Sequence, residues 1–196
     1  MSKTRLEAFS DGVIAILITI MVLSLDVPKG VGHSHFEDLG RQGSTFFTYG
    51  ISFVVLGIYW NNHHHMFQAT KRINGTIMWA NMHLLFWLSL IPFVTDWMGE
   101  RFGPLPVAAY GVVMISAAIA YYILSRVLLA VNGPDSPLAR ALGRDHKAIA
   151  SLVLYAVAVG LALARPWLAV ALYVVVALIW LVPDRRIERV LEAVRD

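Results

Sequence analysis

Residues 5–28 read RLEAFSDGVIAILITIMVLSLDVP, where a short charged and aromatic stretch runs directly into fourteen residues that carry no charge. A helix needs about 20 predominantly apolar residues to cross the hydrocarbon core of a bilayer. This stretch is long enough, and Asp26 and Pro28 end it. Its start contains acidic as well as basic side chains, and no small-residue cleavage site follows it. We therefore interpret it as a retained transmembrane helix and not as a signal peptide.

The composition of the whole chain is that of a membrane protein. Hydrophobic residues make up 58% of the 196 positions and charged residues only 15%, which lies well outside the range of soluble domains. We therefore expect an all-α membrane protein with no separate soluble domain. The chain has no cysteine, which excludes disulfides, thiolate catalysis and sulfur-ligated metals.

Six apolar stretches are long enough, or nearly long enough, to cross a membrane. They are residues 6–25, 44–64, 76–97, 106–131, 148–164 and 167–182. Pro92 is expected to kink the third of them. The pattern predicts a six-helix transmembrane domain over residues 1–184. Residues 185–196 place apolar side chains at spacings of three and four, which predicts a short amphipathic tail.

The distribution of Lys and Arg predicts the orientation of the chain. With the N-terminus inside, 12 of the 16 basic residues lie on the cytoplasmic side of the six expected spans. An even number of spans also brings the C-terminus inside. The basic residues are therefore interpreted as setting orientation, and we expect no nucleic-acid partner.

Polar side chains at membrane depth are concentrated in the first three expected spans. Each costs free energy, about 2.5–3.5 kcal/mol for a central Asp, and so suggests a function. Several lie near helix ends, where a local hydrogen-bonded network is the simpler interpretation. The set comprises Ser10, Asp11, Thr19, Asn61, Asn62, His63, His64, His65, Asn81 and His83.

The histidines raise the possibility of a metal site. Successive helical residues point about 100° apart, so His63, His64 and His65 cannot all bind one ion, and a partner such as His83 would be needed. A second candidate is the loop segment HSHFED at residues 33–38. Packing or surface histidines are commoner than metal ligands, so we predict no metal site and no cofactor. The chain also lacks GxSxG and HExxH motifs, and we predict no enzyme activity.

The start of the first span carries a resemblance to a known family. Arg5, Phe9, Ser10 and Asp11 match the RxxxFSD signature of the transmembrane protein 175 family, the endolysosomal potassium channels and their bacterial relatives. The chain has one such signature, so it resembles a bacterial single-repeat member. The resemblance implies a homotetramer in the bacterial inner (cell) membrane, with four first helices lining a central pore for potassium ions.

The resemblance also implies which residues face the pore. The family places the constriction five residues after the signature Asp, which is Ile16 here, and Thr19, Ile20 and Leu23 would form further rings. At about 100° per residue these four side chains share one stripe with Phe9, whereas Asp11 lies about 140° from Ile16. Other faces of this helix are apolar too, so periodicity alone does not choose the pore face.

Asp11 is therefore expected to brace the helix bundle and not to coordinate ions. The resemblance suggests a network that joins the signature residues to polar side chains of the second and third helices. An Arg5–Asp11 pair within one helix is disfavoured by geometry, so pairing would cross between helices or subunits. Which partners take part stays open among His63, His64, His65, Trp79, His83 and Trp87.

Three functions remain in competition at this point. The first is passive, modestly potassium-selective conduction through a pore with a hydrophobic constriction at Ile16. The second is a proton- or metal-coupled transporter that uses Asp11 and the His63–His65 and His83 side chains. The third is a non-conducting membrane assembly factor.

Overall fold

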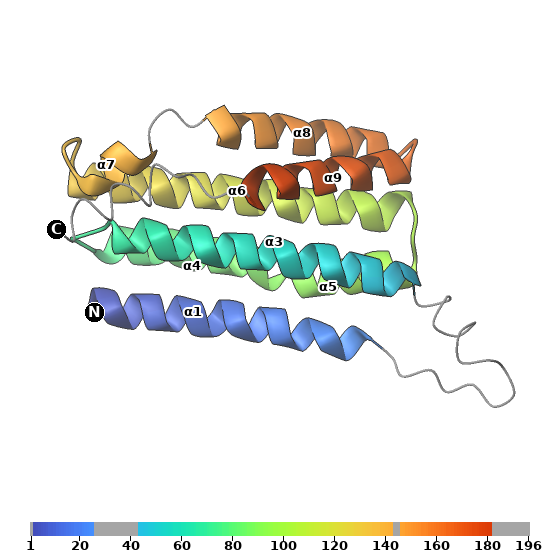
Figure 1. Ribbon diagram of the computed structural model, residues 1–196, viewed down its shortest axis with the longest axis horizontal. Helices are drawn as coiled ribbons and strands as arrows, with labels where there is room; N and C mark the ends of the chain where they lie inside the picture. The colour runs from blue at the N-terminus through green and yellow to red at the C-terminus, as the bar shows by residue number, and fades with distance from the viewer. Residues whose placement is uncertain (1, 26–42, 143–145, 182–196) are drawn as a thin grey trace, which may run out of the picture.

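The structure, a computed structural model, describes residues 2–25, 43–142 and 146–181 and is helical almost throughout these ranges. Its helices run along one long axis, with α1 at one edge of the bundle and α8 and α9 at the other (Figure 1). The elements are α1 Lys3–Ile20, the 3-10 turn η1 Met21–Ser24, α3 Gly43–Gln68, α4 Gly75–Ser89, α5 Ile91–Glu100, α6 Pro104–Asn132, α7 Pro137–Leu142, α8 His146–Ala162 and α9 Pro166–Leu181. The expected amphipathic tail and the histidine-containing loop at residues 33–38 lie outside the described residues.

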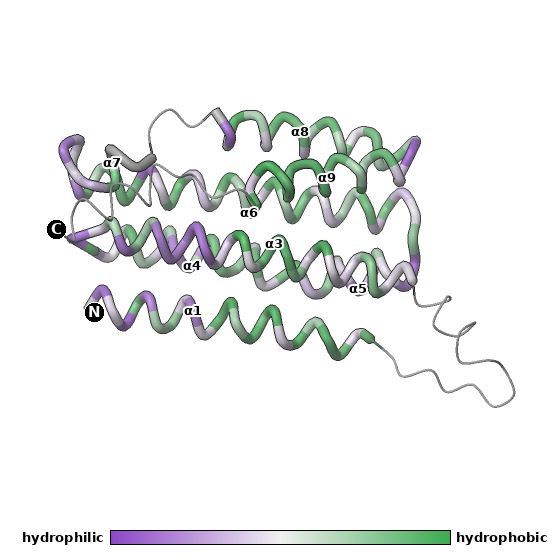
Figure 2. Tube along the Cα trace, in the orientation of Figure 1, coloured by the Kyte–Doolittle hydropathy of each residue, from purple (hydrophilic) through white to green (hydrophobic). Residues whose placement is uncertain are grey.

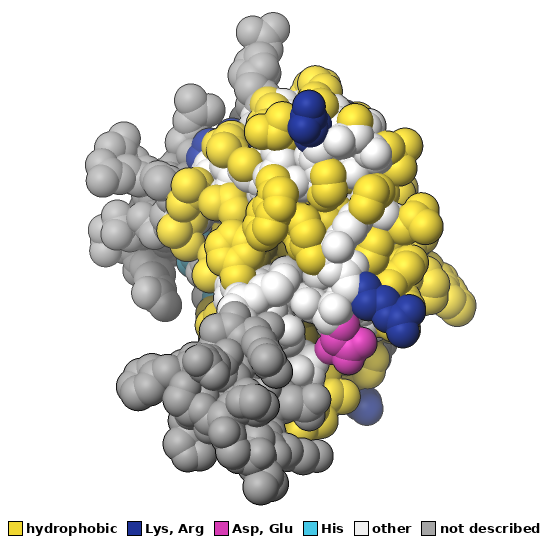
Figure 3. Space-filling view, turned by 90° about the vertical axis from the view of Figure 1, so that its right-hand side faces the viewer, with side chains coloured by type: hydrophobic (Ala, Val, Ile, Leu, Met, Phe, Trp, Pro, Cys, Tyr) yellow, Lys and Arg dark blue, Asp and Glu magenta, His cyan; other side chains and the backbone are white. Residues whose placement is uncertain are grey.

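Four helical segments are long and apolar enough to cross a membrane, which confirms the expected all-α membrane protein. They are Lys3–Ser24, Gly43–Gln68, Gly75–Glu100 and Pro104–Asn132. At the fifth and sixth expected spans, the structure has the apolar helices Lys147–Ala162 and Pro166–Leu181, which are shorter than the four segments above. Hydropathy along the chain shows apolar helix middles with polar ends, most clearly at the start of α1 and the end of α3 (Figure 2). Seen from one end, apolar side chains dominate the visible surface and charged ones are few (Figure 3).

The third span is broken between α4 and α5. The helix ends at Ser89, and Leu90 both closes α4 and starts α5, where Pro92 occupies the first turn. Proline has no N–H to continue the helical ladder, and its ring clashes with the preceding turn. The break lies where the sequence predicted a kink.

The helices pack against one another in a fixed order across the bundle. The first helix packs against α3 and α4, α3 packs against α5, and α6 packs against α4 on one side and α8 on the other. Gly111 of α6 permits close approach of the outer helices, because a Cβ atom there would collide with the Tyr173 hydroxyl of α9 and lie 2.6 Å from Val159. The Tyr173 hydroxyl instead donates to the Val107 carbonyl at 3.0 Å.

The α3–α4 connection is fastened to the end of α6 by one side chain. The Asn132 Oδ1 atom accepts from the backbone N–H groups of Lys71 and Arg72 at 3.0 and 2.9 Å, and its Nδ2 donates to the Arg72 carbonyl at 3.1 Å. Gly133 then ends α6 with φ 88°, a left-handed conformation that favours glycine. This end of the bundle also carries the start of α1, and so it positions the signature residues.

Candidate functional site

One face of α1 turns away from the rest of its own chain. Ile16 is 61% exposed and Leu23 77%, and Phe9, Thr19 and Ile20 are exposed beside them. These are the residues that the sequence grouped into one stripe. In a helix this apolar, such a face must meet lipid, another chain or an ion pathway.

The opposite face of α1 is pinned to the bundle by a buried chain of hydrogen bonds. The Ser10 hydroxyl donates to the Leu6 carbonyl at 2.9 Å, so its oxygen accepts from the Asn81 amide nitrogen of α4, also at 2.9 Å. The Asn81 oxygen is then the acceptor for His63 Nε2 of α3 at 2.8 Å. The Ser10, Asn81 and His63 side chains are fully buried.

The direction of these bonds assigns the protonation of His63. Because Asn81 uses its nitrogen toward Ser10, its oxygen faces the imidazole, and Nε2 must carry the ring proton. His63 Nδ1 is then the unprotonated nitrogen, and it has no hydrogen-bond partner among the described residues. The His63 ring stacks instead on Phe67, with the ring centroids 4.5 Å apart. A neutral histidine suits this buried position, since an isolated charge there is costly.

A second connection joins α1 to α3 at the surface. The Trp60 indole N–H donates to the Asp11 carboxylate at 3.1 Å, and the Trp60 ring stacks on His64. His64 Nε2 lies 2.7 Å from the Gln68 amide nitrogen, and Lys3 Nζ donates to the Gln68 carbonyl at 3.3 Å. Asp11 is therefore engaged at the side of α1 and lies away from the exposed stripe.

The tryptophan that reaches Asp11 within the chain is not one of the two predicted from the sequence. Trp79 is 78% exposed on α4, and the Trp87 N–H donates to His83 Nε2 at 3.0 Å, one turn away on the same helix. A part for Trp79 or Trp87 in the network, within the chain or between subunits, stays a prediction, and sequence spacing gave no information on how α3 is rotated against α1. His65 lies next in α3 with a buried Nδ1 that has no partner among the described residues.

Two residues that the sequence did not assign to the site hold it together. The sequence pattern marks Asn81 only as a polar residue at membrane depth, and the predicted site does not include Trp60. A usable signal existed for Trp60, because it precedes His64 by one helical turn and so shares its face. No such signal identified Asn81 as the bridge between Ser10 and His63.

The charged groups of α1 near this site lie at its polar end. Lys3 Nζ is 3.8 Å from the Glu7 carboxylate, four residues on, and Arg5 is exposed on the side of the stripe. In the part of the chain that the structure describes, no group of three His, Asp or Glu side chains is arranged to hold a metal ion. The site therefore consists of an exposed apolar stripe whose rotation is set by two hydrogen-bonded attachments.

Thr19 is the exception to the apolar character of the stripe. Its hydroxyl hydrogen is directed at the carbonyls of Ala15 and Ile16, both 3.0 Å from Oγ1. The hydroxyl acts only as a donor within the helix, so both lone pairs of its exposed oxygen can accept from or bind a group outside the chain. The stripe thus presents one oxygen acceptor among apolar side chains.

Fold and site together define a polytopic α-helical membrane protein with an outward-facing stripe on its first helix. The family model described as "Endosomal/lysosomal potassium channel TMEM175" matches residues 5–92. A protein named as a potassium channel of a Chryseobacterium species is 48% identical over 98% of this chain and 99% of its own length. Another from Streptomyces collinus is 35% identical over 89% of each chain.

A solved structure and an animal relative extend this comparison. The crystal structure described as a lysosomal potassium-selective channel TMEM175 homolog from Chamaesiphon minutus matches with a TM-score of 0.73 and 26% identity, over 91% of this chain and 95% of that chain. The endosomal/lysosomal proton channel TMEM175 of Bos taurus is 32% identical over 79% of this chain but only 36% of its own length. The chain belongs to the TMEM175 family.

Proposed function

We propose that this chain is the subunit of a potassium-selective channel, a homotetramer of six-span subunits in which four copies of α1 line the pore. Bacterial relatives that match nearly the whole chain are named as potassium channels, which supports conduction over coupled transport. The proposal assigns the chain no catalytic reaction. The permeant ion is K⁺, and no bound cofactor is required.

The observation that carries the proposal is the orientation of α1. Its Ser10 face is tied to α3 and α4, and its Ile16 face has no partner within the described chain. Placing four such helices around an axis covers the Ile16 stripe and leaves the attachments outside the pore. The signature residues Arg5, Phe9, Ser10 and Asp11 then act structurally, by holding the angle at which each α1 meets the axis.

A ring of four Ile16 side chains would form the constriction. A hydrated cation entering such a ring has to lose water without gaining an oxygen ligand, so a narrow ring stays dry and closed. A slight widening admits water and a partly hydrated ion. K⁺ gives up its water at lower cost than Na⁺, which favours K⁺ modestly.

The rings at Thr19, Ile20 and Leu23 extend this narrow region. The outward lone pair of the Thr19 hydroxyl supplies an oxygen for a cation that has passed the apolar ring. Ile16 precedes Thr19 along α1, and Ile20 and Leu23 follow it, so the Thr19 oxygen is the polar side-chain atom of the stripe in this part of the proposed pore. We therefore assign selectivity to Thr19 and closure to Ile16.

The relatives and the charge distribution support the proposed membrane and orientation. Bacterial relatives that match nearly the whole chain, and a majority of Lys and Arg in the segments predicted to be cytoplasmic, support insertion in the bacterial inner (cell) membrane with both termini cytoplasmic. Lys3, Lys71 and Arg72 lie together at that end, as Lys3 contacts the end of α3 and Lys71 follows it.

Potassium flux from liposomes tests the proposal. Purified protein in K⁺-loaded vesicles should release K⁺ passively, and Ile16→Asn should raise the rate because amide groups keep the ring hydrated. Ile149→Asn is the matched control, because Ile149 of α8 has the same 61% exposure as Ile16 but lies on a different helix. It should leave the rate near that of the unmodified protein.

The rival functions give different results in the same assay. Flux that requires a pH gradient across the vesicle would indicate proton-coupled transport through Asp11 and the histidines. Absence of flux in both the unmodified protein and Ile16→Asn would leave the non-conducting assembly factor. Equal stimulation by Ile16→Asn and Ile149→Asn would remove Ile16 from the constriction.

A further inference from the structure

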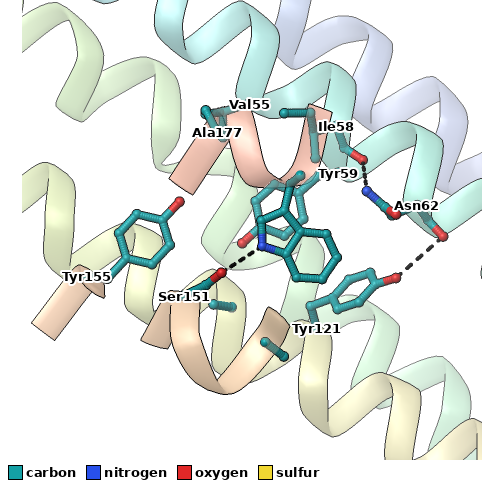
Figure 4. Close-up of a pocket in the computed structure, with 11 residues that line it drawn as sticks. Val55, Ile58, Tyr59, Asn62, Tyr121, Ser151, Tyr155 and Ala177 are labelled. Atoms are coloured by element: carbon teal, nitrogen blue, oxygen red, sulfur yellow. Dashed lines mark hydrogen bonds between the residues drawn. The ribbon is translucent and has the colours of Figure 1, made fainter. Parts of the chain in front are cut away.

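Away from the exposed stripe of α1, a cavity lies where four other helices meet. It measures about 60 Å³ and is lined by side chains of α3, α6, α8 and α9. Figure 4 shows Tyr59 and Asn62 of α3, Tyr121 of α6, and Ser151 and Tyr155 of α8 around it. The wall of the cavity therefore combines aliphatic side chains with phenol, hydroxyl and amide groups.

Two phenol groups of this wall, on Tyr59 and Tyr155, make ring contacts but no hydrogen bond in the part of the chain that the structure describes. Tyr155 is only 5% exposed. A hydroxyl group buried without a partner is costly, because it has lost its hydrogen bonds to water and gained none in return. The two phenols therefore indicate a partner from outside the chain.

The direction of the Tyr155 side chain places its hydroxyl among the other lining groups. Figure 4 shows the Tyr155 ring pointing from α8 toward Tyr59, and both residues line the cavity. Each phenol can donate one hydrogen bond and accept others. The cavity therefore has unused hydrogen-bonding groups on its α3 wall and on its α8 wall.

Two further polar groups of the wall have hydrogen-bonding capacity left over. The Trp180 indole N–H donates to Ser151 Oγ at 2.7 Å, and the Ser151 hydroxyl donates to the Lys147 carbonyl at 2.8 Å, so one lone pair of Ser151 remains. Asn62 Nδ2 donates to the Ile58 carbonyl at 2.8 Å, which leaves its oxygen and its second N–H hydrogen for other partners. A molecule in the cavity therefore meets both donors and acceptors.

Charge and size limit what this cavity can hold. Among the described residues that line it there is no Asp, Glu, Lys, Arg or His, so an ion inside it would be buried without a counter-charge. A buried water molecule needs about 10–15 Å³ and two to four polar partners, whereas the cavities that stay dry in proteins are apolar. This cavity is polar, neutral and large enough for about four water molecules.

We propose that this cavity is a hydration site, in which a cluster of about four water molecules bonds to the Tyr59 and Tyr155 hydroxyls and bridges α3 to α8. Bonds through ordered water are nearly as favourable in enthalpy as direct ones, so the cluster fastens the two helices together. The site takes neutral hydrogen-bonding molecules and no K⁺, and it is separate from the proposed pore. It joins α3, whose Trp60 and His63 side chains hold α1, to the outer helices.

A cryo-electron microscopy map of the full chain in lipid nanodiscs, at a resolution that shows ordered water, tests the site directly. Separate peaks are expected in the cavity, with one within about 2.5–3.0 Å of each of the two phenol oxygens. The proposal is overturned if the cavity shows no peaks, or if one continuous density of a lipid or detergent tail fills it. It is also overturned if the Tyr59 and Tyr155 hydroxyls bond directly to each other.

Thermal unfolding of Tyr155→Phe tests the same site by the sign of its effect. Loss of a hydroxyl that bonds to water should lower the midpoint by about 2–4 °C, the shift for one net hydrogen bond in a chain of this size. In a dry cavity the same change removes an unpaired polar group, so the midpoint would stay or rise. Tyr122→Phe is the matched control, because Tyr122 of α6 is 40% exposed and does not line the cavity, and it should keep the midpoint of the unmodified protein. An unchanged or higher midpoint in Tyr155→Phe, or equal losses in the two variants, would overturn the proposal.

Discussion

A single hydroxyl at Ser10 closes the chain of bonds that sets the rotation of α1. Ser10→Ala leaves the Asn81 amide N–H buried without an acceptor, which should cost about 1–3 kcal/mol of stability. We expect a lower thermal midpoint of the purified protein, measured by fluorescence-monitored unfolding. Ser116→Ala is the control, since the Ser116 hydroxyl bonds only to Val112 of its own helix and is not buried. Equal midpoints for the two variants would contradict a bracing role for Ser10.

The hydroxyl of Thr19 has a different task, because its oxygen faces the exposed stripe. Thr19→Ala removes that oxygen from all four subunits of the proposed pore and should lower the K⁺ to Na⁺ permeability ratio about fivefold, for about 1 kcal/mol of lost interaction. Thr19→Ser keeps the oxygen and should keep the ratio. The reversal potential under K⁺ outside and Na⁺ inside gives this ratio directly. An unchanged ratio in Thr19→Ala would remove Thr19 from selectivity.

At the residue scale, the sequence predicted the directions in which the side chains of α1 point. It did not predict which side chains of other helices they contact. Helical periodicity separated the Ile16 stripe from Asp11, because both lie on one helix whose geometry is known. It could not choose Trp60 over Trp79 or Trp87, because that depends on the rotation and height of α3 and α4 against α1. Asn81 of α4 bonds to Ser10 of α1 and to His63 of α3, so its role as a bridge depends on how three helices pack together. Sequence spacing does not give this packing.

At the scale of helices, the contact of α6 with the outer pair α8 and α9 depends on a glycine. Gly111→Ala places a methyl group against Tyr173 and Val159, so α9 or α8 must move outward at a cost of about 1–3 kcal/mol. We expect a lower thermal midpoint. Gly160→Ala, where a Cβ atom meets nothing within 4 Å, should leave the midpoint within a degree or two or raise it slightly. A larger loss in Gly160→Ala than in Gly111→Ala would contradict this packing.

The helices themselves were predictable to different degrees. The break before α5 followed from Pro92, since proline acts locally whatever surrounds it. The first four spans were predicted from length and apolar composition, which is the property a bilayer demands. The short α7 was not predicted, because six residues give too little periodicity to recognise. The fifth and sixth apolar stretches, residues 148–164 and 167–182, are shorter than the fourth, and α8 and α9 have about these lengths.

At the scale of the whole molecule, one face of α1 has no packing partner within the described chain. Its first helix is held from one side by α3 and α4, and the apolar stripe on the other side is left open. Subunit number is not a property that one chain's composition records, so the tetramer remains part of the proposal and rests on the resemblance. The exposed stripe supports the proposed assembly, since a ring of chains would cover the stripe on all of them at once.

The assembly and the direction of the stripe can be tested together because the chain has no cysteine. Ile16→Cys introduces one thiol per subunit, and a short bis-maleimide should join two subunits across the proposed axis. Because each thiol can be linked only once, denaturing gels should show dimers and no larger species. Native mass spectrometry of the unreacted complex should give about 87 kDa of protein, four times the 21.8 kDa chain.

Ile149→Cys, equally exposed on α8, should not cross-link, because α8 lies at the opposite edge of the bundle from α1 (Figure 1). Cross-linking of Ile149→Cys with none of Ile16→Cys would place α8, and not α1, at the axis of the assembly. This result would contradict the proposed pore.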